Sequence, residues 1–273
     1  MKHVLIMLAV MTLVFGASFL IGGIVRKRIK RKPSAAVHVL ICTGAALAVM
    51  LAGSAVFLSV HYSPGNDAIS VLSDNSGAAV TKTDFGYMID GSGEKAALVF
   101  YPGAKVDTEA YLPLMKQIAD GGVDCFVLDL PMRMAIFDPY GADDVLSHYD
   151  YDVWITSGHS MGGVIAARYA AQHSDIDAVV LLASYTTEPL PEKTALLSVY
   201  GTNDMVLERE AYKSSKRFFP EDFTEVVIDG GNHAQFGDYG EQSGDGEAAI
   251  SAKEQQRITA GAVTEFASKL IGE

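Results

Sequence analysis

A serine flanked by glycines is the residue in this chain best suited to covalent chemistry. The stretch Gly158-His159-Ser160-Met161-Gly162-Gly163 follows a short apolar run at 153–155 and precedes an alanine-rich helical pattern at 164–173. Between a strand and a helix, Gly-x-Ser-x-Gly places the serine on a tight turn with its hydroxyl exposed above the sheet. The pattern alone is weak evidence in a chain with 26 glycines. A serine also needs a base to remove its proton before it can act as a nucleophile.

Two later loops supply an acid and a base for Ser160. Asp204 follows a predicted strand at 195–200, and His233 follows a predicted strand at 224–228. Serine, aspartate, histidine is one of the chain orders in which a catalytic triad is built. In this interpretation His233 accepts the serine proton and later returns it to the leaving group. Asp204 holds the imidazole in the required tautomer and stabilises the imidazolium.

Each of these two residues also has an ordinary structural explanation. An aspartate in a Gly-Thr-Asn-Asp turn is usually a turn former, and a histidine beside two glycines is usually an exposed loop residue. Their joint placement, in order and each after its own strand, favours the triad. Asp229 and Asp238 are rival acids, but the first is too near the histidine in the chain and the second lies in the loop after it. The side chain of His159 is expected to point away from the serine hydroxyl.

The tetrahedral intermediate of acyl transfer needs two backbone donors. The N–H of Met161, directly after the serine and at a helix N-terminus, is the first candidate. The second is expected from the turn after a predicted strand at 96–101, where Pro102-Gly103-Ala104 allows close approach of the backbone. We assign this donor to the N–H of Ala104.

The elements that must position these residues alternate between strand and helix. Strands are predicted at 80–83, 85–89, 96–101, 125–130, 153–156, 178–183, 195–200 and 224–228, with a weak one at 69–72. Helices are predicted at 109–120, 142–148, 161–173, 208–218 and 253–270. Such alternation predicts an α/β fold whose doubly wound, mostly parallel sheet is covered on both faces. Ligands of such sheets bind at the carboxyl ends of the strands.

The first 61 residues have a different character. Residues 4–25 and 34–61 contain no Lys, Arg, Asp or Glu, and each is long enough to cross a hydrocarbon layer. The turn 26–32 between them is strongly basic. We expect residues 1–61 to form a transmembrane helical hairpin, with helices at about 4–25 and 35–60. Residues 62–79 are expected to be a tether and 80–273 the α/β domain.

Basic residues concentrate on the cytoplasmic side of membrane proteins. This rule predicts a cytoplasmic turn at 26–32 and an extracytoplasmic catalytic domain in a multi-pass protein of the cell membrane. A cleaved signal peptide is the rival explanation of the first segment, but its apolar region is too long and the positive charge lies on the wrong side. A basic run can also indicate nucleic-acid binding, which its place between two membrane-length segments disfavours.

Charge and cysteine content exclude some classes of function. All 33 acidic residues but only 14 of the 21 basic ones follow residue 61, which gives that part a formal net charge of −19. Such a negative field disfavours nucleic acid as a partner. The two cysteines, Cys42 and Cys125, imply no disulfide framework and have no metal-ligand spacing. We therefore expect no cysteine-ligated metal site; the oligomeric state stays open.

Four motifs together resemble the α/β-hydrolase superfamily: Tyr101–Val106, Gly158–Gly163, Tyr200–Asp204 and Gly230–Gly240. They are similar in particular to its compact fold-5 branch, which is akin to dienelactone-hydrolase-like enzymes. The resemblance covers about residues 68–270, and the segment after His233 is its most distinctive part. It implies hydrolysis through a serine triad without a cofactor. The chain departs from the family at Ala104, where a second glycine often stands, but the backbone donor survives that change.

A large lid has no room in this chain, because about a dozen residues separate the predicted strands at 178–183 and 195–200. The site is expected to be open with a minimal lid, shaded by the loop 237–246 and by four apolar residues: Met132, Met134, Ile136 and Phe137. Such residues are more often core than pocket. As pocket residues they predict a small-molecule or lipid-like acyl substrate.

The leading hypothesis is a membrane-anchored serine hydrolase that cleaves an ester or related acyl bond through an acyl-enzyme intermediate. Two alternatives stay open. One is a binding or scaffold protein that has kept the fold without turnover, and the other is an acyltransferase that uses the same triad.

Overall fold

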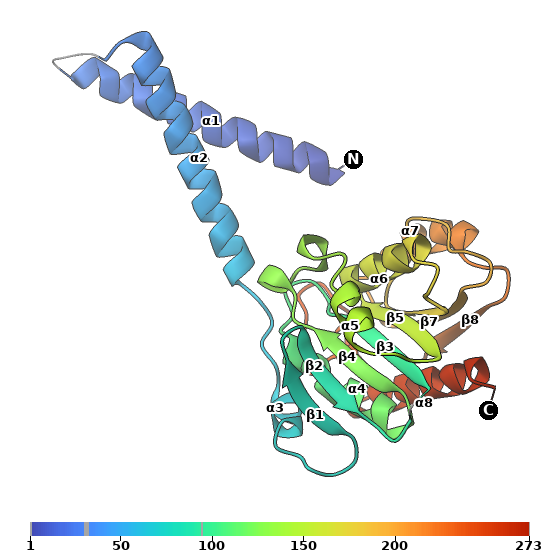
Figure 1. Cartoon of the computed structure of the whole chain (residues 1–273). Helices are drawn as coiled ribbons and strands as arrows, with labels where there is room; N and C mark the ends of the chain where they lie inside the picture. The colour runs from blue at the N-terminus through green and yellow to red at the C-terminus, as the bar shows by residue number, and fades with distance from the viewer. Residues whose placement is uncertain (1, 30–32, 94, 273) are drawn as a thin grey trace. The chain divides into compact units, whose positions relative to one another are not determined.

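The chain forms two compact units, residues 1–60 and 61–273, in a computed structural model that describes residues 2–29, 33–93 and 95–272. The first unit consists of α1 (Lys2–Arg28) and α2 (Ala35–Ser59), which pack against each other (Figure 1). Ser18 Oγ donates a hydrogen bond to the carbonyl oxygen of Cys42 (2.7 Å). Gly22 permits this approach, because a Cβ there would lie 2.3 Å from the Cys42 sulfur. α1 and α2 are thus two packed helices, as a hairpin requires; residues 30–32 of the basic turn lie outside the described residues.

One helical segment in the described part of the chain is long and apolar enough to cross a membrane. It is Ala35–Phe57, with 23 residues and a mean hydropathy of 2.2. At 1.5 Å per residue it spans about 35 Å, against a hydrocarbon core of about 30 Å. That α1 and α2 cross a membrane stays a prediction.

The second unit is built on one sheet of eight strands (Figure 1). Their order across the sheet is β1-β2-β4-β3-β5-β6-β7-β8. The strands are β1 (Ala79–Thr83), β2 (Gly86–Asp90), β3 (Ala96–Tyr101), β4 (Asp124–Leu128), β5 (Val153–His159), β6 (Ala178–Leu182), β7 (Ala195–Gly201) and β8 (Phe223–Ile228). β1–β2 and β2–β4 pair antiparallel, and all the other neighbours pair parallel. The sheet is mostly parallel, as the alternation of elements predicts.

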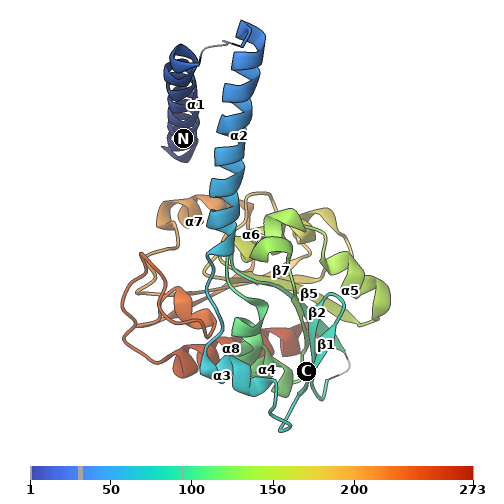
Figure 2. The same cartoon turned by 90° about the vertical axis from the view of Figure 1, so that its left-hand side faces the viewer.

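Helices cover both faces of the sheet. The α-helices of this unit are α3 (Asn66–Val71), α4 (Leu112–Asp120), α5 (Ala142–His148), α6 (Met161–Gln172), α7 (Arg209–Ser215) and α8 (Ala252–Leu270). The 3-10 turns are η1 (Thr108–Tyr111), η2 (Pro131–Arg133), η3 (Ala135–Phe137), η4 (Lys216–Phe218) and η5 (Ala234–Phe236). One apolar core lies between the sheet and α3, α4 and α8, which Figure 2 shows together, and the other lies under α5, α6 and α7.

The side chains of each central strand alternate between the two apolar cores. Leu98 and Phe100 of β3 point into the first core, while Ala97, Val99 and Tyr101 point into the second. Successive side chains of a strand point to opposite faces, so a strand covered on both faces must be apolar throughout. Every residue of β3 is buried, which explains its continuous apolar sequence.

The segment before the sheet is not the loose tether that its composition suggests. The predicted strand at 69–72 is wrong, because these residues fall largely within α3. Tyr62 forms a parallel bridge with Val106. Gly65 N–H donates to the Asp238 carbonyl oxygen (2.6 Å), and Ala68 N–H donates to its carboxylate (2.7 Å). Local sequence failed here because these partners lie far away in the chain.

Shortening one central side chain tests the two-sided core. Leu98 on β3 is fully buried, so Leu98→Ala leaves a cavity and is expected to lower the free energy of unfolding by about 2–5 kcal/mol. Val227→Ala on the edge strand β8, where the side chain is exposed, is expected to cost less than about 1 kcal/mol. Urea unfolding of the full chain in detergent measures both, and equal losses would contradict the burial described here.

Candidate active site

Ser160 lies on a sharp turn between β5 and α6. Its backbone has φ 54° and ψ −124°, a conformation that a non-glycine residue adopts only under strain. Neighbouring glycines permit the turn. A Cβ on Gly162 would lie 2.1 Å from the Tyr101 carbonyl oxygen, and one on Gly158 would lie 2.4 Å from the Gly162 carbonyl carbon. The half-buried serine therefore stands at the carboxyl end of β5.

Asp204 and His233 form a buried pair. Nδ1 of the histidine lies 2.9 Å from Oδ2 of the aspartate, and both side chains are almost fully buried. The other carboxylate oxygen accepts hydrogen bonds from the N–H groups of Val206 (2.9 Å) and Leu207 (2.8 Å). An ionised carboxylate only accepts hydrogen bonds, so this network assigns the proton to Nδ1. Nε2 of His233 is then a free acceptor.

Neither rival acid is bonded to the histidine in the part of the chain that the structure describes. Asp229 accepts a hydrogen bond of 3.4 Å from the Thr202 hydroxyl. The Asp238 carboxylate accepts one from the N–H of Ala68. The structure thus brings Asp204, and not these two, to His233.

Ser160 and His233 line the same cavity, which has a volume of about 330 Å³. Nε2 of the histidine is buried and makes no hydrogen bond within the described residues. The bond from the serine hydroxyl to this nitrogen is therefore not made in the structure. In enzymes without substrate such bonds are often long and tighten only on binding. The geometry leaves Nε2 available to accept a proton.

The turn after β3 lies against the serine turn and offers a backbone donor. A Cβ on Gly162 would strike the carbonyl oxygens of both Tyr101 and Pro102, which shows how closely the two turns approach. Gly103 N–H is already used, because it donates to the Tyr111 hydroxyl (3.0 Å). Ala104 N–H makes no hydrogen bond among the described residues. It is the free donor of this turn.

The second predicted donor is at the start of α6. Met161 is the first residue of that helix. The first N–H groups of a helix lack an intrahelical acceptor and carry the positive end of the helix dipole. Both expected N–H groups can therefore receive a negative oxygen that develops beside the serine.

His159, immediately before the serine, packs against the base. Its ring centroid lies 4.5 Å from that of His233, and its Nδ1 lies 2.9 Å from the Tyr111 hydroxyl. Because that hydroxyl accepts from Gly103 N–H, its own proton is free to go to Nδ1. Burial, and then the repulsion that two protonated rings this close would feel, hold the pKa of His159 well below its ordinary value of 6.5. His159 is therefore neutral and packs against the His233 ring. Sequence reasoning missed this role because Tyr111 lies 48 residues away.

Asp245 joins the loops that carry Asp204 and His233. One carboxylate oxygen accepts from the N–H of Met205 (3.2 Å), next to Asp204, and the other accepts from the N–H of Ala234 (2.9 Å), next to His233. Asp245 is not among the residues that the sequence predicts for the site. The only local signal was its position between two glycines in the segment that follows the histidine.

The four apolar pocket candidates lie outside the cavity beside Ser160. Met132, Ile136 and Phe137 are exposed, and Met134 is half-buried. The apolar part of the cavity wall comes from other residues: Met161, Val164, Ala183, Tyr185, Val206 and Leu207. The pocket thus opens between α6 and the ends of β6 and β7. Sequence could not indicate this, because the wall is assembled from three separate segments.

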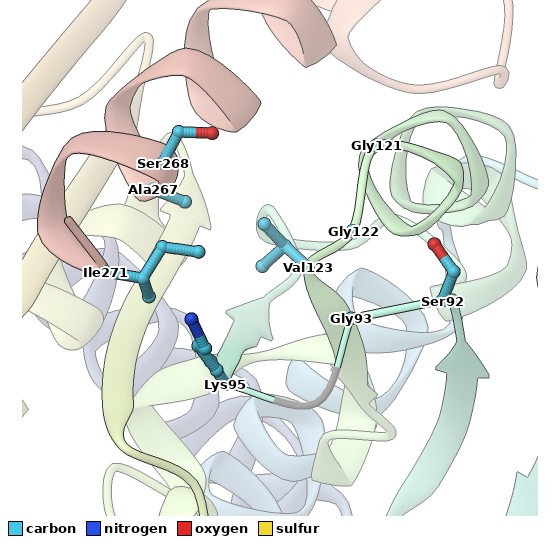
Figure 3. Close-up of a pocket in the computed structure, with 9 residues that line it drawn as sticks. All are labelled: Ser92, Gly93, Lys95, Gly121, Gly122, Val123, Ala267, Ser268 and Ile271. Atoms are coloured by element: carbon cyan, nitrogen blue, oxygen red, sulfur yellow. The ribbon is translucent and has the colours of Figure 1, made fainter. Parts of the chain in front are cut away.

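A larger cavity of about 450 Å³ lies at the opposite end of the strands (Figure 3). Lys95 and Val123, which line it, directly precede β3 and β4. Ser92 and Ser268 contribute hydroxyl groups, but none of the described residues that line it is a histidine or carries a carboxylate. The wall described here therefore offers neither of the usual bases for a serine nucleophile. Within the described residues, no group of three or more His, Cys, Asp or Glu is arranged to hold a metal ion.

The buried neutral His159 has a consequence for stability. Its pKa is lower in the folded chain than the ordinary 6.5, so unfolding takes up a proton below about pH 6.5. We expect the free energy of unfolding to fall by up to about 1.4 kcal/mol per pH unit on acidification from this group alone. His159→Gln keeps an acceptor for Tyr111 but does not titrate. Its pH dependence should be weaker between about pH 7.5 and 5, and identical slopes in urea unfolding would show that His159 is not held neutral.

Removing the Asp245 charge should loosen both loops together. An asparagine at this position offers one acceptor oxygen where the carboxylate offers two, so one backbone N–H loses its partner, at a cost of about 1–3 kcal/mol. In Asp245→Asn, hydrogen exchange should accelerate in peptides covering 203–207 and 232–236. The exposed Asp222→Asn removes the same charge elsewhere and should leave these peptides unchanged. If hydrogen exchange in these peptides is unchanged in Asp245→Asn, Asp245 does not hold the two loops together.

The fold is shared with solved structures of low sequence identity. Esterase 2 of Thermogutta terrifontis phosphonylated by sarin is 14% identical, with a TM-score of 0.52, covering 72% of this chain and 96% of that one. DcsB in complex with its substrate analogue is 15% identical, with a TM-score of 0.51, covering 72% and 99%. Mouse alpha/beta hydrolase domain-containing protein 10 is 10% identical, with a TM-score of 0.51, covering 71% and 100%.

No curated protein sequence is significantly similar to the chain. The sequence pattern of the alpha/beta hydrolase family matches residues 97–257, well over half of the chain. This match spans Ser160, Asp204 and His233, and the chain therefore belongs to the alpha/beta hydrolase family.

Proposed function

We propose that the chain is a serine hydrolase that cleaves an ester or related acyl bond. Nε2 of His233 takes the proton of Ser160 as the serine oxygen attacks the acyl carbon. The carbonyl oxygen becomes negative and is stabilised by the N–H groups of Met161 and Ala104. The imidazolium, stabilised by Asp204, then gives its proton to the leaving group, and the acyl-enzyme forms. Water repeats the sequence and restores the free serine.

One observation carries this proposal. The Asp204–His233 pair is buried, its hydrogen bond fixes the proton on Nδ1, and Nε2 is left without a partner among the described residues, beside the cavity that Ser160 also lines. A buried nitrogen without a partner is costly in a folded protein unless it has a task. The phosphonylated esterase among the similar structures adds support at the level of the fold. The mechanism needs no metal or cofactor.

The substrate and the location of the enzyme belong to the same proposal. The cavity wall is largely apolar, which suits the acyl part of a small-molecule or lipid-like substrate. We further propose that α1 and α2 anchor the enzyme in the cell membrane as a hairpin with its basic turn in the cytoplasm. In this arrangement the alpha/beta domain lies outside the cytoplasm.

Labelling with a fluorophosphonate tests the nucleophile. Wild-type protein should react and lose activity on p-nitrophenyl butyrate, whereas Ser160→Ala should do neither. Ser147→Ala, an exposed helix serine, is the matched control and should react like wild type. Asp204→Asn should lower kcat by about 10⁴-fold, because the wrong imidazole tautomer is then favoured. If labelling persists in Ser160→Ala, Ser160 is not the nucleophile. If the wild-type protein shows neither labelling nor turnover, the alternative of a binding or scaffold protein without catalytic activity is favoured.

A further inference from the structure

Three large apolar side chains stand exposed on the turn that follows β4. Met132, Ile136 and Phe137 are 58%, 56% and 53% exposed. They are carried by residues 131–137, here called the docking turn, in which Met132 and Arg133 both have positive φ (53° and 58°). Non-glycine residues keep such a conformation only where the surrounding structure holds them. The fold thus holds apolar groups in water here, and a cluster of that kind indicates an interaction surface.

The docking turn is bonded to the residues that follow α2. Lys105 N–H donates to the Arg133 carbonyl oxygen (2.8 Å), and the Arg133 guanidinium pairs with Asp107. The other oxygen of Asp107 lies 3.4 Å from Nε2 of His61. Tyr62 N–H donates to the Lys105 carbonyl oxygen (2.7 Å), and Asp107 N–H donates to the Tyr62 carbonyl oxygen (3.0 Å). Two backbone hydrogen bonds in succession therefore connect Tyr62 to the docking turn.

Chain length then limits how far this turn can lie from a bilayer. α2 ends at Ser59, three residues before Tyr62. Three extended residues span roughly 10 Å. The polar headgroup layers add roughly 10–15 Å in total to a hydrocarbon core of about 30 Å. If α2 crosses the membrane, Tyr62 stays at the interface in every orientation of the domain, and the docking turn stays beside it.

The docking turn also adjoins the candidate active site. η3 packs against α6, which begins directly after Ser160. On its other side the turn is bonded to Lys105, the neighbour of Ala104. The docking turn and the candidate active site therefore share two neighbours, α6 and the turn at Ala104.

We propose that the docking turn inserts its apolar side chains into the bilayer that holds α2, and that the substrate is an acyl ester taken from that bilayer. The substrate part rests on the serine hydrolase function proposed above. The net charge of the domain limits which lipids the docking turn can bind. The part of the chain after residue 61 has a net charge of −19, so anionic lipids repel it. Attachment comes from apolar insertion, and zwitterionic lipid is the expected partner.

Insertion can be measured without turnover. Cys42 and Cys125 are replaced by alanine, Ile136→Cys carries an environment-sensitive fluorophore, and the full chain is reconstituted in phosphatidylcholine vesicles. The emission should shift to the blue and be quenched by lipids brominated near the headgroups. Val227→Cys, exposed on the edge strand β8, is the matched control and should show neither effect. Equal emission and quenching at the two positions would overturn the insertion.

The origin of the substrate is tested by a ratio of rates. The triple variant Met132→Ser, Ile136→Ser, Phe137→Ser is compared with wild type on a long-chain ester in the same vesicles and on soluble p-nitrophenyl butyrate. We expect the ratio of vesicle to soluble rate to fall at least tenfold. An unchanged ratio would overturn the proposal. If wild type cleaves neither ester while the fluorophore still inserts, the hydrolase function fails and the membrane surface stands.

Discussion

A buried negative charge at Asp204 is the constraint on which the rest of the site depends. Removing a carboxylate from water costs several kcal/mol unless donors replace the lost hydration. Three donors do so: the ring N–H of His233 and two backbone N–H groups of the following turn. Because the charge must keep these partners, the imidazole has one orientation and one tautomer. Its second nitrogen is then left at the cavity that Ser160 shares.

Two neighbouring groups extend this constraint to the rest of the site. Asp245 fixes the loops of Asp204 and His233 with a single carboxylate. On the other side, Tyr111 accepts a hydrogen bond from the turn that carries Ala104 and contacts His159, whose ring supports His233. The proposed oxyanion donors and the proposed base are thus held by one connected network. A shift of either loop disturbs both halves of the chemistry.

The sequence was sufficient where structure is decided locally. Alternating apolar runs and helical patterns predicted the order of strands and helices, and the glycines around Ser160 predicted its turn. Prediction failed where distant partners decide. Residues 66–71 form a helix because Asp238 caps and holds them from across the chain. The cavity wall, the role of His159 and the bridge from Asp245 likewise depend on contacts between separate segments, which no local pattern records.

Tyr62 gives the beginning of the domain an unexpected importance. Its two backbone hydrogen bonds hold the strand of chain that leads out of the turn at Ala104. A proteolytic cut before His61 would release a domain in which Tyr62 keeps both backbone hydrogen bonds. A cut only a few residues later would remove Tyr62, and the chain after Ala104 would lose these two hydrogen bonds. The position of the cut, and not merely the release of the domain, would therefore decide whether the turn at Ala104 keeps its support from Tyr62.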